Sequence, residues 1–181
     1  MNSENRQEVI RAKIVMVGAP DVGKTSLVRR FVHSNFSNEY SSTLGVKVDR
    51  KLVMLDGAAV SMVLWDMHGE TEGLDVPPGY LRGAGAAIGV FDTTRPETAK
   101  TAASLLQRVA EQSSRAITTA VANKSDLMAS DASNGDIQTL GTVTNSTPHE
   151  TSALNGDGVD ELFTTIAWGL ARRAGLGADD S

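Results

Sequence analysis

The chain has 181 residues, of which 40% are hydrophobic, and its formal net charge is −5. This length fits one domain of ordinary size, and the acidic charge gives no support for nucleic-acid binding. The sequence contains no cysteine, which excludes disulfides, thiolate zinc sites and thiol nucleophiles. No apolar run approaches the length of a membrane span, and the first residues lack the apolar segment of a signal peptide. We therefore expect a cytoplasmic protein.

Polar stretches frame a single domain and are predicted to be flexible tails. They comprise residues 1–11 and 175–181, so the domain itself spans residues 12–174. Strands are predicted at 12–17, 46–55, 59–65, 86–91, 117–122 and 147–150. Helices are predicted at 27–31, 96–111, 135–140 and 159–170. Alternating elements with right-handed crossovers favour an α/β fold, in which helices cover both faces of a mostly parallel sheet.

The first predicted strand leads into a glycine-rich loop that fits the phosphate-binding pattern G-x-x-x-x-G-K-[ST]. Glycines let the backbone curl, and the N-terminus of the following helix presents unpaired N–H groups to a phosphate. Lys24 can reach the β- and γ-phosphates of a nucleotide, and the Thr25 hydroxyl can bind Mg²⁺. The loop residues expected to contact the nucleotide are Asp21, Val22, Gly23, Lys24, Thr25 and Ser26. A turn that matches the pattern by chance is the alternative.

A hairpin and two long polar loops come next. The Asp56-Gly57 pair between two apolar runs predicts an antiparallel hairpin. The loops comprise residues 33–44 and 66–79, and long loops in compact domains are often functional.

The second hairpin strand ends in Trp65-Asp66-Met67-His68-Gly69. The Asp66 carboxylate can hold Mg²⁺ through water, and the Gly69 N–H can approach a γ-phosphate because no Cβ intervenes. Asp-x-x-Gly is common by itself, and an ordinary turn is the alternative. Its position after the hairpin favours the nucleotide interpretation.

Two further motifs point to the base of the nucleotide. Asn123-Lys124-Ser125-Asp126 follows the strand at 117–122. Asp126 can accept hydrogen bonds from N1–H and N2–H₂ of guanine, a donor pair that adenine lacks. Lys124 can lie over the base, and Asn123 can tie this loop to the phosphate-binding loop. A polar turn is the alternative.

The last motif, Glu150-Thr151-Ser152-Ala153, precedes the final helix. Its Ala153 N–H can donate to guanine O6, although the signal is weak when taken alone. We expect Ser152, Ala153 and Leu154 to contribute to the base site.

In this order and at these separations, the four motifs resemble those of the small GTPases of the Ras superfamily, most closely the Rab-like members, over residues 12–172. The resemblance implies the phosphate-loop G domain, with a six-stranded sheet that has one antiparallel edge strand. It implies that Thr43 is a second Mg²⁺ ligand and that Phe36 packs against guanine. It also implies that residues 34–45 and 66–80 are switch loops that contact regulators and effectors.

The departures from this family pattern concern catalysis and anchoring. Glu70 stands where the family has a glutamine that orients water, and an ionised glutamate only accepts hydrogen bonds. The direction of its effect on hydrolysis stays open, since a base and a repulsive charge act oppositely. Pro20 and Asp21 occupy the phosphate loop where small residues are usual, and Leu154 replaces a lysine. Without a C-terminal cysteine, we expect no direct lipid anchor.

These observations predict that the protein is a molecular switch that binds GTP or GDP with Mg²⁺ and slowly hydrolyses GTP. Lys24, Gly69 and Glu70 are its candidate catalytic residues. The alternative is an interaction module that binds these nucleotides, recruits partners and hydrolyses almost nothing. A kinase or ATPase on the same loop is disfavoured by Asn123-Lys124-Ser125-Asp126.

Overall fold

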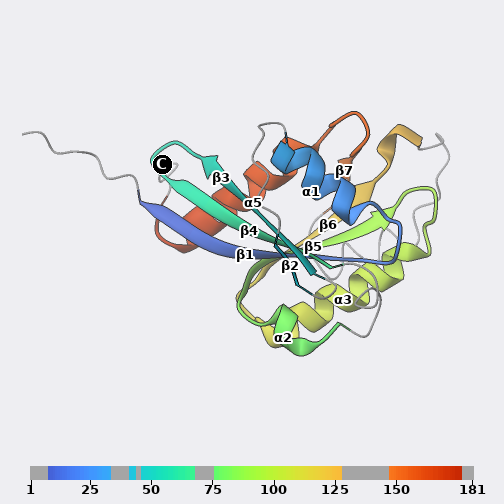
Figure 1. Ribbon diagram of the computed structural model, residues 1–181, viewed down its shortest axis with the longest axis horizontal. Coiled ribbons are helices and arrows are strands. Elements are labelled where there is room, and N and C mark those ends of the chain that lie inside the picture. Colours follow the sequence, from blue (N-terminus) through green and yellow to red (C-terminus); the bar gives the residue numbers. More distant parts are fainter. Residues whose placement is uncertain (1–7, 34–40, 44–45, 68–75, 128–146, 177–181) are drawn as a thin grey trace, which may run out of the picture.

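A seven-stranded sheet forms the centre of the protein (Figure 1). The computed structural model describes residues 8–33, 41–43, 46–67, 76–127 and 147–176. The strands are β1 (Val9–Val17), β2 (Ser41–Thr43), β3 (Val46–Met54), β4 (Ala59–Met67), β5 (Ala84–Asp92), β6 (Ile117–Asn123) and β7 (His149–Thr151). The helices are α1 (Lys24–His33), α2 (Pro78–Leu81), α3 (Thr98–Gln112), α5 (Val159–Arg173) and the 3₁₀ turn η2 (Ser125–Leu127).

The strand order is β2-β3-β4-β1-β5-β6-β7, and β3 alone runs against its neighbours. This arrangement confirms the predicted α/β fold with its mostly parallel sheet and all six predicted strands. The sheet also contains β2, three residues that the sequence assigned to a loop. A short polar segment that pairs through its backbone alone carries no apolar periodicity. The antiparallel strand β3 is consequently second from the edge rather than at it.

Helices cover the sheet on both faces (Figure 1). On one face, α1 and α5 pack on Ile14, Met16 and other apolar residues of β1, β4 and β5. On the other face, α3 packs on Val15, Val17 and their neighbours. Successive side chains of a strand point to opposite faces, so a strand buried on both faces needs a continuous apolar run. This requirement explains the uninterrupted apolar sequence at residues 14–17.

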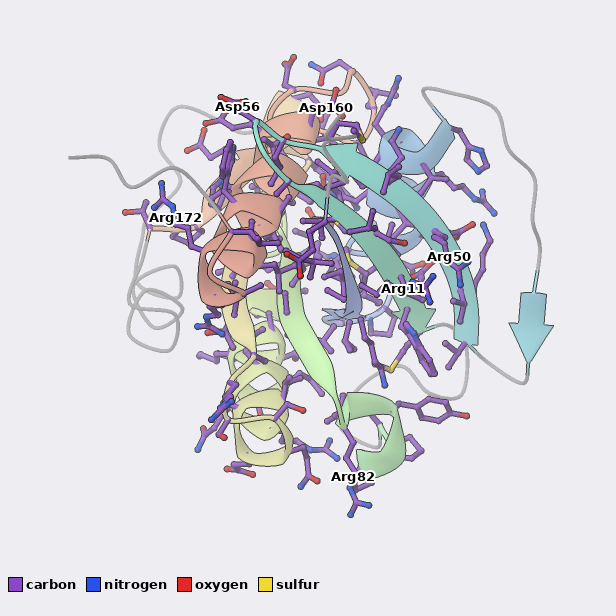
Figure 2. All side chains as sticks on the ribbon, turned by 90° about the vertical axis from the view of Figure 1, so that its left-hand side faces the viewer. Arg11, Arg50, Asp56, Arg82, Asp160 and Arg172 are labelled. Atoms are coloured by element: carbon purple, nitrogen blue, oxygen red, sulfur yellow. The ribbon has the colours of Figure 1, made fainter. Side chains whose placement is uncertain are left out.

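The amino-terminal boundary of the domain differs from the prediction. Strand β1 begins at Val9 rather than at residue 12, and Val9 pairs with Ala59 of β4. At this end the sheet face that carries Arg11 and Arg50 is exposed (Figure 2). A strand with polar, exposed residues on one face reads as a tail, so the predicted tail of residues 1–11 extends at least three residues too far.

Some predicted segments lie wholly or partly outside the described residues, and one predicted loop boundary differs from the structure. Most of the two switch loops and the predicted helix at 135–140 lie outside the described residues. The loop predicted at 66–79 begins later, because β4 continues to Met67 and includes Asp66. None of the helices described is long and apolar enough to cross a membrane.

The carboxyl ends of the parallel strands meet at one edge of the sheet. Met16 pairs with Asp66, while Asp92 pairs with Asn123 and Asn123 with Thr151. Ligands of open α/β sheets bind in the crevice beyond this edge. The register therefore brings the four sequence motifs, which are far apart in the chain, to one place.

Candidate functional site

The phosphate-binding loop connects β1 to α1 and lies tightly against its surroundings. Gly18 has φ +148° and Gly23 has φ +98°, both unfavourable for residues with a side chain. A Cβ on Gly18 would lie 2.2 Å from the Val90 oxygen, and one on Gly23 would lie 2.2 Å from Asn123 Nδ2. The glycines therefore provide close approach to β5 and β6 as well as conformational freedom.

Each backbone carbonyl of residues 18 to 22 accepts a hydrogen bond from a side chain. The contacts are Lys24 Nζ to Gly18 O (3.2 Å) and Ala19 O (2.8 Å), Arg95 Nη2 to Pro20 O (3.0 Å), Lys124 Nζ to Asp21 O (3.0 Å), and Asn123 Nδ2 to Val22 O (2.9 Å). In a trans peptide the N–H points away from the C=O. Arg95, Lys124 and Asn123 come from other parts of the fold and fix the carbonyls of residues 20 to 22. Fixing these oxygens also fixes the N–H groups on the opposite side of each peptide, where successive backbone N–H groups can form an anion site.

Helix α1 begins within the same loop. The Leu27 N–H donates to the Gly23 oxygen at 2.9 Å, which closes the first helical turn. Lys24 is 5% exposed and lies in this first turn, together with Thr25. The positive end of the helix and the Lys24 ammonium thus meet the loop from the same direction.

Asp92, at the end of β5, is a buried carboxylate that organises two cations. Its Oδ2 accepts from Lys124 Nζ at 2.6 Å and from Arg95 Nε at 3.1 Å, and its Oδ1 accepts from the Thr94 amide and hydroxyl. Burial by itself raises the pKa of Asp92, but the hydrogen bonds from Lys124, Thr94 and Arg95 outweigh it and lower the pKa to about 2. Asp92 is therefore ionised at neutral pH and fixes Lys124 in place.

Asn123 connects the phosphate loop to the loop after β7. Its Nδ2 donates to Val22 O, while its Oδ1 accepts from Thr151 Oγ1 and from the Ala153 amide, each at 3.2 Å. The Ala153 N–H that was predicted to meet guanine O6 is thus already engaged within the protein. A contact to the base would share or replace that bond.

A pocket of about 390 Å³ lies beside these contacts. It is lined by Gly23, Ser26, Arg30, Asn123, Lys124, Asp126, Leu127, Ala153 and Leu154. Asp126, in η2, is positioned by a hydrogen bond from Ser152 Oγ to its Oδ1. Leu154 is 74% exposed at the pocket wall. The structure therefore gathers five of the predicted base-binding residues, namely Asn123, Lys124, Asp126, Ala153 and Leu154, around one pocket of a size that fits a nucleotide.

Sequence reasoning missed Arg30, Asp92, Arg95 and Leu127. Arg30 of α1 donates from Nε to the Ala153 oxygen at 3.0 Å and from Nη2 to the Leu154 oxygen, which holds the loop after β7 against α1. Arg30 lies outside the four motifs, and its partners are backbone atoms about 120 positions away. Asp92 did leave a signal, because an acidic residue ends an otherwise apolar strand.

The predicted metal ligands are described only in part. Thr25 lies in the first turn of α1, and Asp66 is fully buried at the end of β4, beside Met16. Hydroxyl and carboxylate oxygens suit Mg²⁺, which is commonly bound by one or two protein groups together with substrate phosphates. Within the described ranges no cluster of three or more histidine, cysteine or acidic residues is found. The oxygen donors of Thr25 and Asp66 thus suit a Mg²⁺ ion whose remaining ligands a nucleotide and water would supply.

The remaining predicted site residues cannot be located. Phe36, Gly69 and Glu70 lie outside the described residues, and for Thr43 only the backbone within β2 is described. Their predicted roles stay predictions.

A phosphate-binding loop at the carboxyl edge of a mostly parallel sheet, beside a pocket that contains Asn123, Lys124 and Asp126, defines a phosphate-loop guanine-nucleotide-binding domain. A sequence model described as the Ras family matches residues 13–171. The chain is also 36% identical over 165 aligned residues to the Ras-related protein RABF2b of Arabidopsis thaliana. The alignment covers 90% of this chain and 82% of that protein.

The chain belongs to the Ras family. It is a Rab-like small GTPase that binds guanine nucleotides, and proteins of this class act as switches through regulators and effectors.

Proposed function

We propose that this protein alternates between GTP-bound and GDP-bound states with Mg²⁺ and hydrolyses GTP slowly when it acts alone. The observation that carries the proposal is the direct linkage of the two nucleotide motifs. Asn123 and Lys124, from the base motif, donate to the carbonyls of Val22 and Asp21 in the phosphate loop. A ligand that fills both parts must carry a base and phosphates at once, as GTP and GDP do.

Different residues of the site are proposed to bind the base, the phosphates and Mg²⁺. Asp126 reads the base, with Ser152 holding its carboxylate, and Lys124 covers the base while it stays fixed by Asp92. Lys24 and the loop N–H groups stabilise the charge on the phosphates. Thr25, Thr43 and Asp66 would hold Mg²⁺, and the ion would supply positive charge to offset the negative charge of the phosphates.

Slow hydrolysis follows from the available cations. Residues 33–43 contain no arginine that could reach the γ-phosphate from within the chain. Arg95 does reach the phosphate loop, but its guanidinium binds the Pro20 carbonyl and the Asp92 carboxylate. We therefore propose that an activator supplies an arginine in trans. Glu70 acts on the attacking water, and Gly69 contacts the γ-phosphate.

Partner binding is proposed for residues 34–45 and 66–80. These segments contain Thr43 and Gly69, the two groups that a γ-phosphate would hold together. We propose that regulators and effectors distinguish the two states there. A cytoplasmic location stays a prediction.

The alternative is a nucleotide-binding module with negligible hydrolysis, which Glu70, Pro20 and Asp21 favour. Phosphate release from protein loaded with a single equivalent of GTP separates the two. Release that depends on Mg²⁺ and is absent in Lys24→Ala supports the switch. Stable GTP over many hours in the wild type, together with tight binding, would favour the module.

A further inference from the structure

We propose that Arg95 is a positioning residue for the nucleotide phosphates. By holding the Pro20 carbonyl on the outer side of the phosphate loop, it aims the Asp21 N–H at the bound nucleotide. The inference rests on the proposed nucleotide function and deepens it, because Arg95 lies outside all four sequence motifs.

The Arg95 guanidinium contacts two acceptors at once, the Asp92 carboxylate and the Pro20 carbonyl oxygen. Its Nε lies 3.1 Å from Asp92 Oδ2, and its Nη2 donates to Pro20 O at 3.0 Å. The Arg95 amide also donates to the Asp92 carbonyl at 2.9 Å. Asp92 is 1% exposed and is fixed in β5, so the guanidinium has a rigid support from which to hold the loop. A planar guanidinium suits two simultaneous acceptors at fixed angles.

The loop needs such a support at this position. Pro20 has no N–H, so the Asp21 amide is the first donor that the loop offers after Ala19. Asp21 also has φ +59°, a left-handed conformation that residues with a side chain seldom adopt. The peptide between Pro20 and Asp21 is planar and trans, so fixing its oxygen outward fixes its N–H inward.

The position of Asp21 indicates which phosphates it serves. The base pocket is lined by Gly23 and Ser26, so the phosphate nearest the nucleoside lies toward these two residues. Asp21 precedes them in the loop and lies toward the second and third phosphates. Loss of Arg95 is therefore expected to weaken the binding of GDP and GTP more than the binding of GMP.

The experiment compares Arg95→Ala, Arg95→Lys and the wild type, with Arg172→Ala as the control. Arg172 is an exposed arginine near the end of α5, directed away from the body of the protein (Figure 2). The dissociation rate of a fluorescent GDP is measured for each protein, and the affinities of GDP and GMP are obtained by competition.

Arg95→Ala is expected to release GDP about 3- to 10-fold faster, the effect of losing one partly exposed charged hydrogen bond. The ratio of GDP affinity to GMP affinity falls by a similar factor, Arg95→Lys recovers part of the loss, and Arg172→Ala behaves as the wild type.

Two outcomes would overturn the inference alone: unchanged GDP release from Arg95→Ala, or an equal loss of GDP and GMP affinity. A wild-type protein that binds no GDP would instead overturn the proposed function and this inference together.

Discussion

The Asp92 carboxylate accepts four hydrogen bonds, from Lys124, Arg95 and both the amide and the hydroxyl of Thr94. It is 1% exposed, and its pKa is lowered to about 2 from the ordinary 3.8, so it stabilises the fold above pH 3.8 and loses this effect as the pH falls toward 2. Asp92→Asn is expected to destabilise the protein by about 2 kcal/mol at neutral pH. The loss of stability between about pH 4 and pH 2 becomes shallower in the variant.

Urea unfolding across this pH range measures both effects. Asp160→Asn, at an exposed position in the first turn of α5, is the control and should follow the wild type. Wild type and Asp92→Asn curves that fall in parallel would show that Asp92 does not hold its partners as described.

Asp126 permits a test of base recognition at a single residue. Asp126→Asn replaces one acceptor by a donor, which then faces the N2–H₂ donor of guanine at a cost of about 1–3 kcal/mol. Xanthine has a carbonyl at that position and would accept from the new amide. The variant should therefore lose affinity for GTP and gain affinity for xanthosine triphosphate. Competition titrations of both nucleotides against both proteins measure the exchange, and a variant that still prefers guanine would remove Asp126 from the base site.

At the residue scale, the sequence reveals groups that would touch a ligand and misses those that act through backbone atoms. Lys124 and Asp126 were predicted because their chemistry matches a base, and Asn123 was predicted, within the same motif, to tie this loop to the phosphate loop. Arg30 and Arg95 bind carbonyl oxygens, which every residue carries, so no side-chain pattern marks them. Such contacts depend on tertiary placement, which one sequence does not reveal.

At the scale of elements, the phosphate loop makes two equally close contacts, one with β5 at Gly18 and one with β6 at Gly23. Gly23→Ala would place a methyl group 2.2 Å from Asn123 Nδ2 and would force φ +98° on an alanine. We expect a loss of several-fold or more in GDP affinity and a destabilisation above the ~1–2 kcal/mol of backbone strain alone.

Gly57→Ala, at the hairpin turn between β3 and β4, is the matched control. Gly57 has φ +77° but no atom within 4 Å of an added Cβ, so it tests the strain without the clash. GDP titration and urea unfolding of both variants separate the two terms. Equal destabilisation with full GDP affinity in both would contradict a tight junction.

The switch segments provide a second prediction for elements. Residues 34–45 and 66–80 should exchange amide hydrogens more slowly with a non-hydrolysable GTP analogue than with GDP, since only a γ-phosphate can hold Thr43 and Gly69 at once. Hydrogen exchange in the two states measures this, with α5 as an internal reference. Equal protection of both segments in the two states would favour the non-switching module.

Elements were predictable where burial imposes a pattern. The strand at 86–91 and the helix at 96–111 were found within about two residues of their ends, because both are buried and periodic. The start of β1 and the whole of β2 were missed, since an exposed or very short strand needs only backbone pairing.

At the scale of the whole molecule, the site joins segments from both halves of the chain. The loop after β1, the turn after β5, the loop after β6 and the loop after β7 all contribute contacts. A bound nucleotide therefore stabilises the entire domain and not one loop. GDP at about 1,000 times its dissociation constant contributes about 4 kcal/mol, or about 8–16 °C in Tm for a chain of this size.

Removal of GDP and Mg²⁺ by a chelator and phosphatase should lower Tm by this amount, as followed by calorimetry. Lys24→Ala, whose phosphate contact is lost, should show little dependence of Tm on GDP. A wild-type Tm that is insensitive to GDP would argue against a nucleotide that bridges the domain.

The hydrogen bonds that other strands and turns make to the phosphate-loop carbonyls have a consequence for the timing of signals. The donors are Arg95, Lys124 and Asn123, which follow or end other strands of the sheet, and Arg95 belongs to no base-reading motif. A substitution at Arg95 would change how long a nucleotide stays bound without changing which base is chosen. The duration of a signal and the identity of the nucleotide are therefore separate properties in this fold, and selection can adjust the first while the second is preserved.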